Sequence, residues 1–266
     1  MRLPKISIIT IVFNNVDVIL DALNSVKDQT YSGIEHIVID GGSTDGTAEI
    51  VGAFPFDESI LINEPDEGIY DALNKGLKLA TGDVIGVLHS DDVFADEHVI
   101  SDVAKEFSCS EVDAVYGDLV YVMRDNVDIV ARKWRSCVYN DGLLRKGWMP
   151  PHPTLFLRND VIKKCGKFDP KYRISADYDF ILRCFSSEIK NSRYIPNILV
   201  KMRIGGVSNR SLSTILLKMR EDYLVLRKNR VGGIFVLLRK NLRKLSQLSL
   251  CGPLLRLLIG PKGNRD

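Results

Sequence analysis

Residues 34–47 read IEHIVIDGGSTDGT, and this stretch decides the fold. Its apolar, β-branched part, Ile34–Ile39, is typical of a strand that is buried on both faces. Asp40 follows the strand directly, the paired glycines make a turn, and a helical pattern covers Thr44–Phe54. The stretch therefore predicts a buried strand with an acid at its carboxyl end, followed by a helix that returns along the sheet.

The same alternation of strand and helix extends on both sides of this stretch over the first 110 residues. Continuous apolar runs predict strands, and apolar residues three and four positions apart predict helices. The further predicted strands are Ile6–Phe13, Ser59–Ile62 and Val84–Leu88, and the further predicted helices are Val16–Lys27, Ile69–Ala80 and His98–Phe107. This alternation predicts an α/β fold with a mostly parallel central sheet and helices on its faces.

From residue 114 onward the pattern predicts a mixed second half. Ala114–Met123 and Val127–Trp134 are expected to form a hairpin, followed by a strand over Thr154–Leu157 and a helix over Tyr178–Phe185. After Gly205-Gly206, two basic helices are expected over residues 213–230 and 234–249. We therefore expect one domain over residues 1–204 and a basic, amphipathic helical tail over residues 205–266.

The composition excludes some classes of protein. The chain has 266 residues, of which 45% are hydrophobic and 26% charged, so its bulk is not disordered. A net charge of +2 excludes a uniformly basic nucleic-acid binder, and no nucleic acid is expected as a partner. The charge is uneven, because residues 201–266 carry 15 Lys or Arg against 3 Asp or Glu. Such a tail points to an anionic partner.

The tail has two interpretations of equal weight. Its basic helices and the apolar segment at residues 254–259 can lie on an anionic membrane surface, giving peripheral contact through residues 213–259. Alternatively, the helices pack on the body and expose a solvated basic face.

Five cysteines without a C-x-x-C pair indicate reduced thiols, and neither a signal peptide nor a membrane-spanning stretch is recognisable. We expect a cytoplasmic protein, or one peripheral to the cytoplasmic membrane face.

Acidic residues follow three successive predicted strands. Asp40 follows the second strand, the segment NEPDEG at residues 63–68 follows the third, and HSDD at residues 89–92 follows the fourth. Because ligands of open parallel sheets bind at the carboxyl ends of the strands, these acids are expected to converge on one crevice. An alternative for Ser43–Thr47 and for Asp66 is helix capping, which leaves Asp40 unexplained.

The adjacent Asp91 and Asp92 predict a metal site. Two carboxylates at the end of an apolar strand are costly to bury without partners, and Mg²⁺ or Mn²⁺ would remove that cost. The sequence contains no P-loop or other phosphate-cradling glycine motif, so bound phosphates would need such a metal. The alternative is that the pair caps the helix that follows Phe94.

Asp177, Asp179 and His152 are further candidates. The two acids flank Tyr178 at the start of a predicted helix, where either could act as a general base or merely favour the helix dipole. His152 lies between two prolines in a loop, as a substrate contact or as an ordinary turn residue.

Several motifs in register resemble family 2 glycosyltransferases of the inverting, GT-A-fold kind, especially the branch that builds bacterial surface polysaccharides. The resemblance covers roughly residues 4–190. The matching motifs are ISIITIVFNN at residues 6–15, VIDGGSTDGT at residues 38–47, EPDEGIYDALNKG at residues 64–76, SDD at residues 90–92, FD at residues 168–169 and SADYDF at residues 175–180.

The resemblance implies transfer of a sugar from a nucleoside-diphosphate sugar to a saccharide acceptor. We expect UDP rather than GDP as the nucleotide, and an acceptor carried on a membrane lipid would explain the basic amphipathic tail. It implies Mg²⁺ or Mn²⁺ as cofactor. The implied roles are nucleotide contact by Asp40, ribose contact by Asp91, metal binding by Asp92, and general base catalysis by Asp177 with Asp179 as the fallback. We add Ile11, Asp66 and Gly68 as candidates for donor binding and His152 as a candidate for acceptor binding.

The sequence departs from the family pattern at two positions. Gly41 stands where many members have a second acid assigned to the base ring, and His89 stands where they have the first acid of the metal motif.

Two other functions compete with sugar transfer. One is a sugar nucleotidyltransferase, although residues 10–20 lack the basic residues expected to hold a triphosphate. The other is a non-catalytic peripheral membrane protein that acts through its tail.

Overall fold

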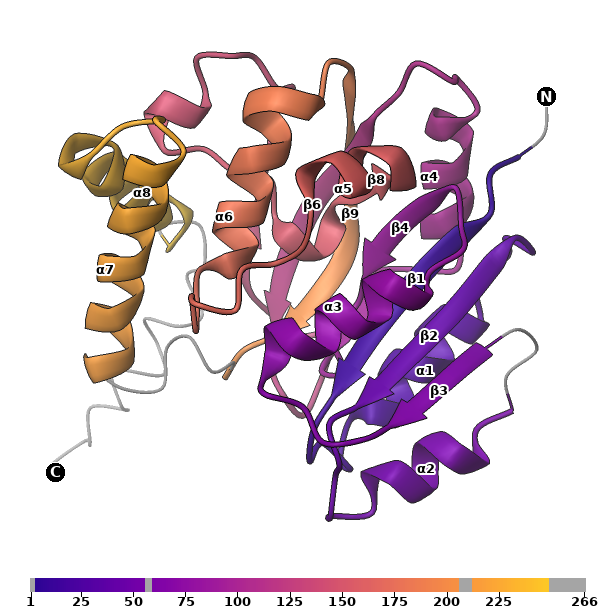
Figure 1. Cartoon of the computed structure of the whole chain (residues 1–266). Helices are drawn as coiled ribbons and strands as arrows, with labels where there is room; N and C mark the ends of the chain where they lie inside the picture. Colours follow the sequence, from indigo (N-terminus) through magenta and orange to yellow (C-terminus); the bar gives the residue numbers. More distant parts are fainter. Residues whose placement is uncertain (1–2, 56–58, 206–211, 249–266) are drawn as a thin grey trace, which may run out of the picture.

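The computed structural model describes residues 3–55, 59–205 and 212–248 (Figure 1). In these ranges the strands form one sheet of nine. The strands are β1 (Ile6–Val12), β2 (Ile34–Asp40), β3 (Ser59–Asn63), β4 (Val84–Val87), β5 (Asp92–Phe94), β6 (Ala114–Val122), β7 (Val130–Trp134), β8 (Phe156–Arg158) and β9 (Ser192–Arg203). Their order across the sheet is β3-β2-β1-β4-β8-β6-β9-β5, with β7 paired to β6.

The first four strands form the parallel part of the sheet, as predicted. β1 pairs in parallel with both β2 and β4, and β2 pairs in parallel with β3. The second half is mixed, because β8 is antiparallel to β4 and β6, whereas β6 and β9 are parallel. The predicted hairpin forms from β6 and β7. The expected α/β class and mixed second half are therefore confirmed.

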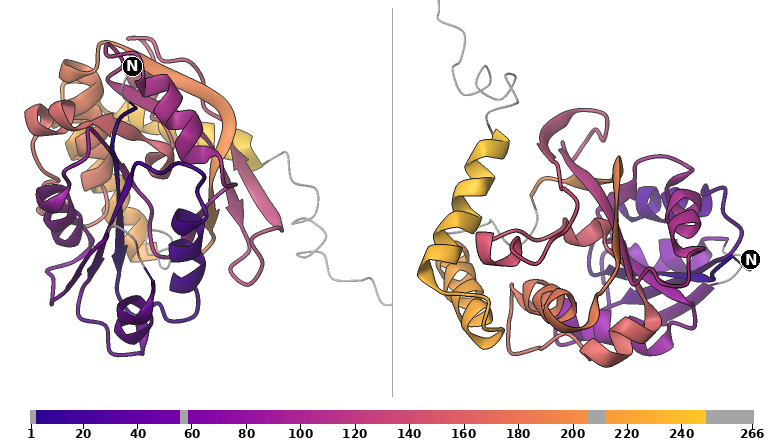
Figure 2. Two further views of the ribbon diagram at one scale, coloured as in Figure 1. Left: turned by 90° about the vertical axis from the view of Figure 1, so that its right-hand side faces the viewer. Right: turned by 90° about the horizontal axis from the view of Figure 1, so that it is seen from above.

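Helices cover both faces of the sheet (Figures 1 and 2). One face carries α3, α5 and α6, and the other carries α1 and α4. The α-helices are α1 (Ile19–Lys27), α2 (Thr47–Ala53), α3 (Ile69–Leu79), α4 (Val99–Phe107), α5 (Asn159–Cys165), α6 (Ala176–Arg183), α7 (Leu212–Lys228) and α8 (Ile234–Leu248). Three short turns, η1 (Leu144–Lys146), η2 (His152–Thr154) and η3 (Cys184–Glu188), complete the described elements.

Burial of β1 explains why its sequence is a continuous apolar run. All seven of its residues are buried, and each fully buried isoleucine contributes about 1.5–3 kcal/mol. Its two polar side chains have partners, because the Ser7 hydroxyl donates to Glu35 at 2.5 Å and Thr10 contacts His36 at 2.9 Å. This central strand fixes the positions of its neighbours, and hence of the loops at their carboxyl ends.

The structure differs from the sequence prediction in three elements. The prediction lacks β5, α5 and β9, and β9 is twelve residues long. β9 lies between β6 and β5, so the second half of the sheet depends on a strand that the sequence did not reveal. In addition, α1 begins at Ile19 rather than at Val16.

The two C-terminal helices pack on the body through one face, which matches the second interpretation of the tail. Val225, Leu226, Val236 and Leu237 are buried in the main core with the residues of α6. Within the described ranges, no helix is both long and apolar enough to span a membrane. The described cysteines are free thiols, whereas Cys251 and the apolar segment 254–259 lie outside the described residues. The domain boundary near residue 205 stays a prediction.

Candidate active site

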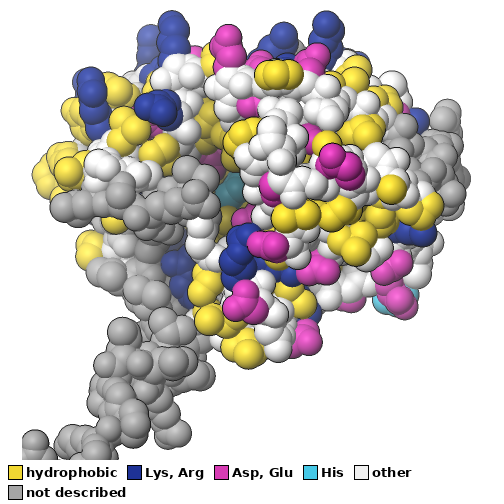
Figure 3. Space-filling view, turned by 90° about the horizontal axis from the view of Figure 1, so that it is seen from below, with side chains coloured by type: hydrophobic (Ala, Val, Ile, Leu, Met, Phe, Trp, Pro, Cys, Tyr) yellow, Lys and Arg dark blue, Asp and Glu magenta, His cyan; other side chains and the backbone are white. Residues whose placement is uncertain are grey.

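The carboxyl ends of the parallel strands meet at one end of the molecule, as expected. Figure 3 views this end and shows a hollow with a histidine side chain at its floor and acidic side chains near its rim. The strand register places Asp40 on β2 directly beside Val12 on β1 and Asn63 on β3. The loops that carry the predicted site residues therefore start from adjacent positions.

Asp40 is fully buried and only half satisfied. Its Oδ1 accepts hydrogen bonds from the Ser43 backbone N–H at 2.9 Å and from the Ser43 hydroxyl at 2.7 Å. Its Oδ2 is buried without a hydrogen-bond partner among the described residues. Because an unpartnered buried oxygen costs about 1–3 kcal/mol, this geometry favours a ligand that donates to Oδ2. Helix capping does not account for Asp40, since α2 begins seven residues later.

Asp66 occupies the space above Gly41. A methyl group built on Gly41 would collide with the Asp66 Oδ2 atom and would lie 3.0 Å from its Cγ. The other carboxylate oxygen accepts the Gly68 N–H at 2.8 Å, which holds the loop before α3 in place. The missing second acid after Asp40 thus has a spatial substitute from the next strand end. The sequence could not reveal this, because it depends on how the two loops fold together.

Asp92 follows the loop after β4, and it is also buried with one oxygen that has no hydrogen-bond partner among the described residues. It is the first residue of β5 and pairs with Met202 of β9. Its Oδ1 accepts the Arg203 N–H at 3.3 Å, whereas no described group forms a hydrogen bond with the buried Oδ2. Burial, with the neighbouring Asp91 charge, raises the pKa of Asp92 well above its ordinary value. A cation beside Asp92 would favour the ionised form of this carboxylate and so oppose the rise of its pKa.

The donor set suits a hard divalent ion whose other ligands come from a substrate. Among the described residues, no three His, Cys, Asp or Glu side chains are grouped to hold a metal on their own. Asp92 offers one buried oxygen, and Mg²⁺ or Mn²⁺ is commonly bound by one or two carboxylates together with substrate phosphates. The orphan oxygen of Asp92 thus fits the predicted cofactor.

Arg203 at the end of β9 fixes the backbone around these acids, and the sequence analysis missed it. Its guanidinium donates to the carbonyl oxygens of Asp91 at 3.0 Å and Arg124 at 2.9 Å, and it forms an ion pair with Asp21. Arg203 is buried, whereas the Asp21 side chain is 55% exposed, so the ion pair lies at the protein surface. The available signal was a lone arginine at the end of an apolar run, which is weak without knowledge of β9.

Asp177 reaches the same region from the opposite half of the chain. It lies in the first turn of α6, with the Tyr70 hydroxyl 3.4 Å from Oδ1 and the His152 Nδ1 atom 3.8 Å from Oδ2. The His152 ring in turn lies 5.6 Å from the His89 ring, two residues before Asp91. The Asp177 side chain keeps 27% of its surface exposed, so a substrate can reach it.

Both histidines are neutral near pH 7. Burial lowers the pKa of His152 to about 4, against the opposing charge of Asp177. Burial also lowers the pKa of His89, although the nearby Asp91 and Asp177 charges oppose the shift. Because both acids act on His89, the strand-end acids and Asp177 share one electrostatic environment. Each imidazole can therefore offer one N–H donor and one acceptor here.

Asp179 is placed differently from Asp177. Its carboxylate is fully buried and accepts hydrogen bonds from Arg183 Nε at 2.9 Å and Asn229 Nδ2 at 2.9 Å, with Lys228 Nζ 3.2 Å away. These groups come from α6 and from the end of α7, so Asp179 joins the two helices. It faces away from solvent and has no free oxygen for a substrate.

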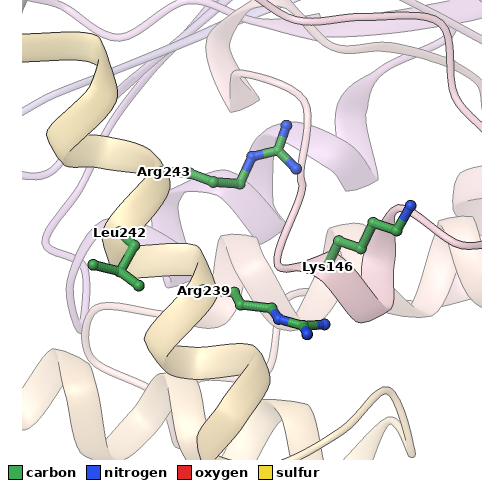
Figure 4. Close-up of a pocket in the computed structure, with 4 residues that line it drawn as sticks. All are labelled: Lys146, Arg239, Leu242 and Arg243. Atoms are coloured by element: carbon green, nitrogen blue, oxygen red, sulfur yellow. The ribbon is translucent and has the colours of Figure 1, made fainter.

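The remaining predicted site residues are spread around this region. Ile11 is buried in the core beside Tyr70, with 6% of its surface exposed, and Gly68 is exposed at the start of α3. A separate surface pocket lies on α8 and η1 and is lined by Lys146, Arg239, Leu242 and Arg243, with both arginines extending from α8 toward the side of Lys146 (Figure 4). That pocket contains no predicted site residue.

The chain matches a known family of proteins. Residues 7–165 match the family model "Glycosyl transferase family 2". A PGL/p-HBAD biosynthesis glycosyltransferase of Mycobacterium bovis (strain BCG / Pasteur 1173P2) is 33% identical over 223 residues, which cover 82% of this chain and 84% of the relative. The predicted family resemblance is therefore confirmed.

Solved structures share the fold at low sequence identity. The 1–349 fragment of S. aureus TarS in complex with UDP has a TM-score of 0.61 and 17% identity, over 84% of this chain and 65% of that one. The mannosyltransferase PcManGT from Pyrobaculum calidifontis, in complex with GDP-Man and Mn²⁺, has a TM-score of 0.63 and 16% identity, over 96% and 78%. This chain spans 39% of a longer TarS chain. These likenesses confirm the expected GT-A fold.

Proposed function

This chain belongs to glycosyl transferase family 2, and on that premise we propose that it is an inverting, metal-assisted transferase in bacterial polysaccharide or glycolipid assembly. The donor is a nucleoside-diphosphate sugar, with UDP preferred to GDP, and the acceptor is a lipid-linked saccharide. The observation that carries the proposal is that Asp40, at the carboxyl end of β2, and Asp92, at the start of β5, each have a buried carboxylate oxygen without a hydrogen-bond partner among the described residues. Buried polar atoms in a protein core normally have hydrogen-bond partners, and a nucleotide with its metal would supply a partner for each of these two oxygens.

The donor half of the site divides into two roles. Asp40 and Asp66 face the nucleotide, where carboxylate oxygens accept the N–H groups of a base, while Asp91 accepts from the ribose hydroxyls. Gly68 brings the backbone close to the donor, and Ile11 supports the floor of the site from β1. Asp92 holds the divalent ion, which when bound neutralises the charge that develops on the leaving diphosphate.

Asp177 is the proposed general base. Its carboxylate takes the proton of an acceptor hydroxyl as that oxygen forms its bond to the anomeric carbon. The bond from the anomeric carbon to the diphosphate oxygen breaks on the opposite face, and its electron pair stays with the leaving nucleotide. A single displacement of this kind inverts the anomeric configuration. His152 beside Asp177 orients the acceptor through its one N–H donor.

Thermal unfolding of the full chain with UDP and Mn²⁺ tests the donor site. A ligand at a hundred times its Kd stabilises a protein by about 2.7 kcal/mol, which corresponds to a rise of about 5–10 °C in Tm. We expect Asp92→Asn to lose the Mn²⁺-dependent part of this rise, while Asp125→Asn, at an exposed acid, keeps it. An equal response in both variants would refute the metal assignment. GDP in a parallel assay tests the preference for UDP.

Transfer assays with candidate UDP-sugars and lipid-linked acceptors test the reaction itself. We expect release of UDP with Mn²⁺ and a product of inverted configuration by NMR. A product with retained configuration would refute direct displacement, and consumption of a nucleoside triphosphate would favour the nucleotidyltransferase alternative.

Peripheral membrane contact is a second part of the proposal, and it rests on the exposed face of α8. Phe235 is 77% exposed and Leu242 is 62% exposed, and Leu242 lines the same pocket as Lys146, Arg239 and Arg243 (Figure 4). Exposed apolar side chains interleaved with cations suit an anionic lipid surface, where a lipid-linked acceptor would lie. The double variant Phe235→Ser, Leu242→Ser should sediment less with phosphatidylglycerol vesicles than the control Leu20→Ser. Equal sedimentation would remove this part.

A further inference from the structure

Three backbone N–H groups converge on one buried carboxylate from α7. The Glu221 side chain accepts the N–H groups of Arg173 at 2.9 Å, Ile174 at 2.9 Å and Ser175 at 3.0 Å. Residues 173–175 form the loop that enters α6, and Glu221 is 6% exposed. A single carboxylate thus satisfies the whole turn of backbone that precedes Asp177.

The next residue of α7 binds the same loop through its side chain. Asp222 accepts the Ser175 hydroxyl at 2.8 Å, and it pairs with Lys240 Nζ of α8 at 2.8 Å. Lys240 also lies over the Tyr178 ring, with Nζ 3.2 Å from its centroid. Burial lowers the pKa of Lys240, and the Asp222 charge opposes that shift. A buried acid, cation and aromatic ring therefore lock α6, α7 and α8 together.

This arrangement is costly if its only purpose is to attach two helices. Buried ion pairs often stabilise a protein no more than apolar side chains of similar size would. What they add is direction, because they hold particular groups in particular places. Here those contacts end on the loop immediately before Asp177. The Tyr70 hydroxyl binds that loop from the opposite side, through the Ile174 carbonyl oxygen at 2.6 Å, and also lies 3.4 Å from Asp177.

We propose that Glu221 and Asp222 are positioning residues for sugar transfer, which fix the entry of α6 and hence the place of the Asp177 carboxylate. Neither residue touches the reacting atoms. The inference rests on the proposed role of Asp177 as general base, and it makes the C-terminal helices part of the active site. Because a displacement of about 1 Å in a catalytic group costs about a hundredfold in rate, a small shift of the loop is sufficient.

The variants Glu221→Gln and Asp222→Asn test the inference. In Glu221→Gln, one oxygen becomes an NH₂ donor that faces backbone N–H groups, so the loop must move. We expect kcat to fall tenfold to a hundredfold, while KM for the donor and Kd for UDP stay within about twofold of the wild type, because the strand-end acids are untouched. Arg220→Gln, at the exposed neighbouring position, is the matched control and should keep the wild-type kcat.

Hydrogen exchange gives a readout that does not depend on activity. The amides of residues 173–175 should exchange faster in Glu221→Gln than in the wild type or in Arg220→Gln, and Glu221→Asp, which retains a carboxylate, should recover part of the protection and of kcat. Wild-type kcat in Glu221→Gln, or parallel losses of kcat and UDP affinity, would overturn the inference. Full activity of Asp177→Asn would instead refute the proposed base, and the exchange result would stand separately.

Discussion

The two variants Asp177→Asn and Asp179→Asn, both in α6, distinguish an acid needed for catalysis from an acid needed for stability. Asp179 is fully buried and accepts bonds from Arg183 and Asn229, with Lys228 close by, so its replacement leaves cations facing a neutral amide. Loss of one partner from a buried ion pair costs about 3–5 kcal/mol. The lower end applies here, because Lys228 is 44% exposed and keeps a second acidic partner.

A loss of about 3 kcal/mol corresponds to a fall of about 6–12 °C in Tm for a chain of this size. Asp177→Asn should behave in the opposite way. Its polar contacts are long, at 3.4 and 3.8 Å, and it is partly exposed, so its free energy of unfolding should change by less than about 0.5 kcal/mol. Its kcat should nevertheless fall by about 10²–10⁴.

Two measurements on the same preparations decide the matter: thermal unfolding, and initial transfer rates well below the lower Tm. The expected pattern is crossed, with stability lost in Asp179→Asn and rate lost in Asp177→Asn. Wild-type stability with abolished transfer in Asp179→Asn would make Asp179 the acting acid. Wild-type kcat in Asp177→Asn would refute the reasoning altogether.

Three further predictions concern packing, binding and pH. Gly41→Ala should displace the Asp66 carboxylate and weaken UDP binding about tenfold, equivalent to one charge-assisted hydrogen bond, as measured by calorimetry; an unchanged Kd would exclude Asp66 from the nucleotide site. Gly86→Ala places a methyl group 2.6 Å from the Phe156 Cδ1 atom and should cost about 1–3 kcal/mol in urea unfolding, whereas no loss would contradict rigid packing there. Burial raises the pKa of Glu35, but the hydrogen bonds that its carboxylate accepts outweigh burial and lower the pKa from 4.5 to about 2. The ionised carboxylate therefore contributes fully to the free energy of unfolding above pH 4.5, and this contribution is lost as the pH falls towards 2. Glu35→Gln should flatten the stability profile across that range, and an unchanged profile would contradict this reading.

Much of the first half was predictable from the sequence, because its elements are local. The run Ile34–Ile39 and its parallel neighbours are rich in isoleucine and valine, and a period of two or of 3.6 can be read within a dozen residues. The position of Asp40 followed from the strand end alone. What could not be predicted is the Asp66 carboxylate over Gly41, because it depends on two loops that meet only after folding.

The second half resisted prediction because its elements are defined by distant partners. β5 has three residues and exists only through its pairing with β9. β9 contains Pro196 and several exposed residues, so it lacks a clear alternation. Asp177 and Asp179 lie about 200° apart around α6, and the sequence cannot tell which side α7 covers. The adjacent acids Glu221 and Asp222 in an otherwise basic tail were the signal that this segment is anchored to the body.

The pairing of β5 with β9 also sets an order of assembly during synthesis. Asp92 and the Arg203 amide that holds it are 111 positions apart along the chain. The ribosome delivers β1–β4 long before β9, so the nascent chain can form the nucleotide end of the crevice while Asp92 still lacks its neighbouring strand. A chain stalled before residue 192 would therefore carry Asp40 in place on an incomplete sheet. The proposed metal site at Asp92 is therefore complete only after β9, which ends at Arg203, has left the exit tunnel and paired with β5.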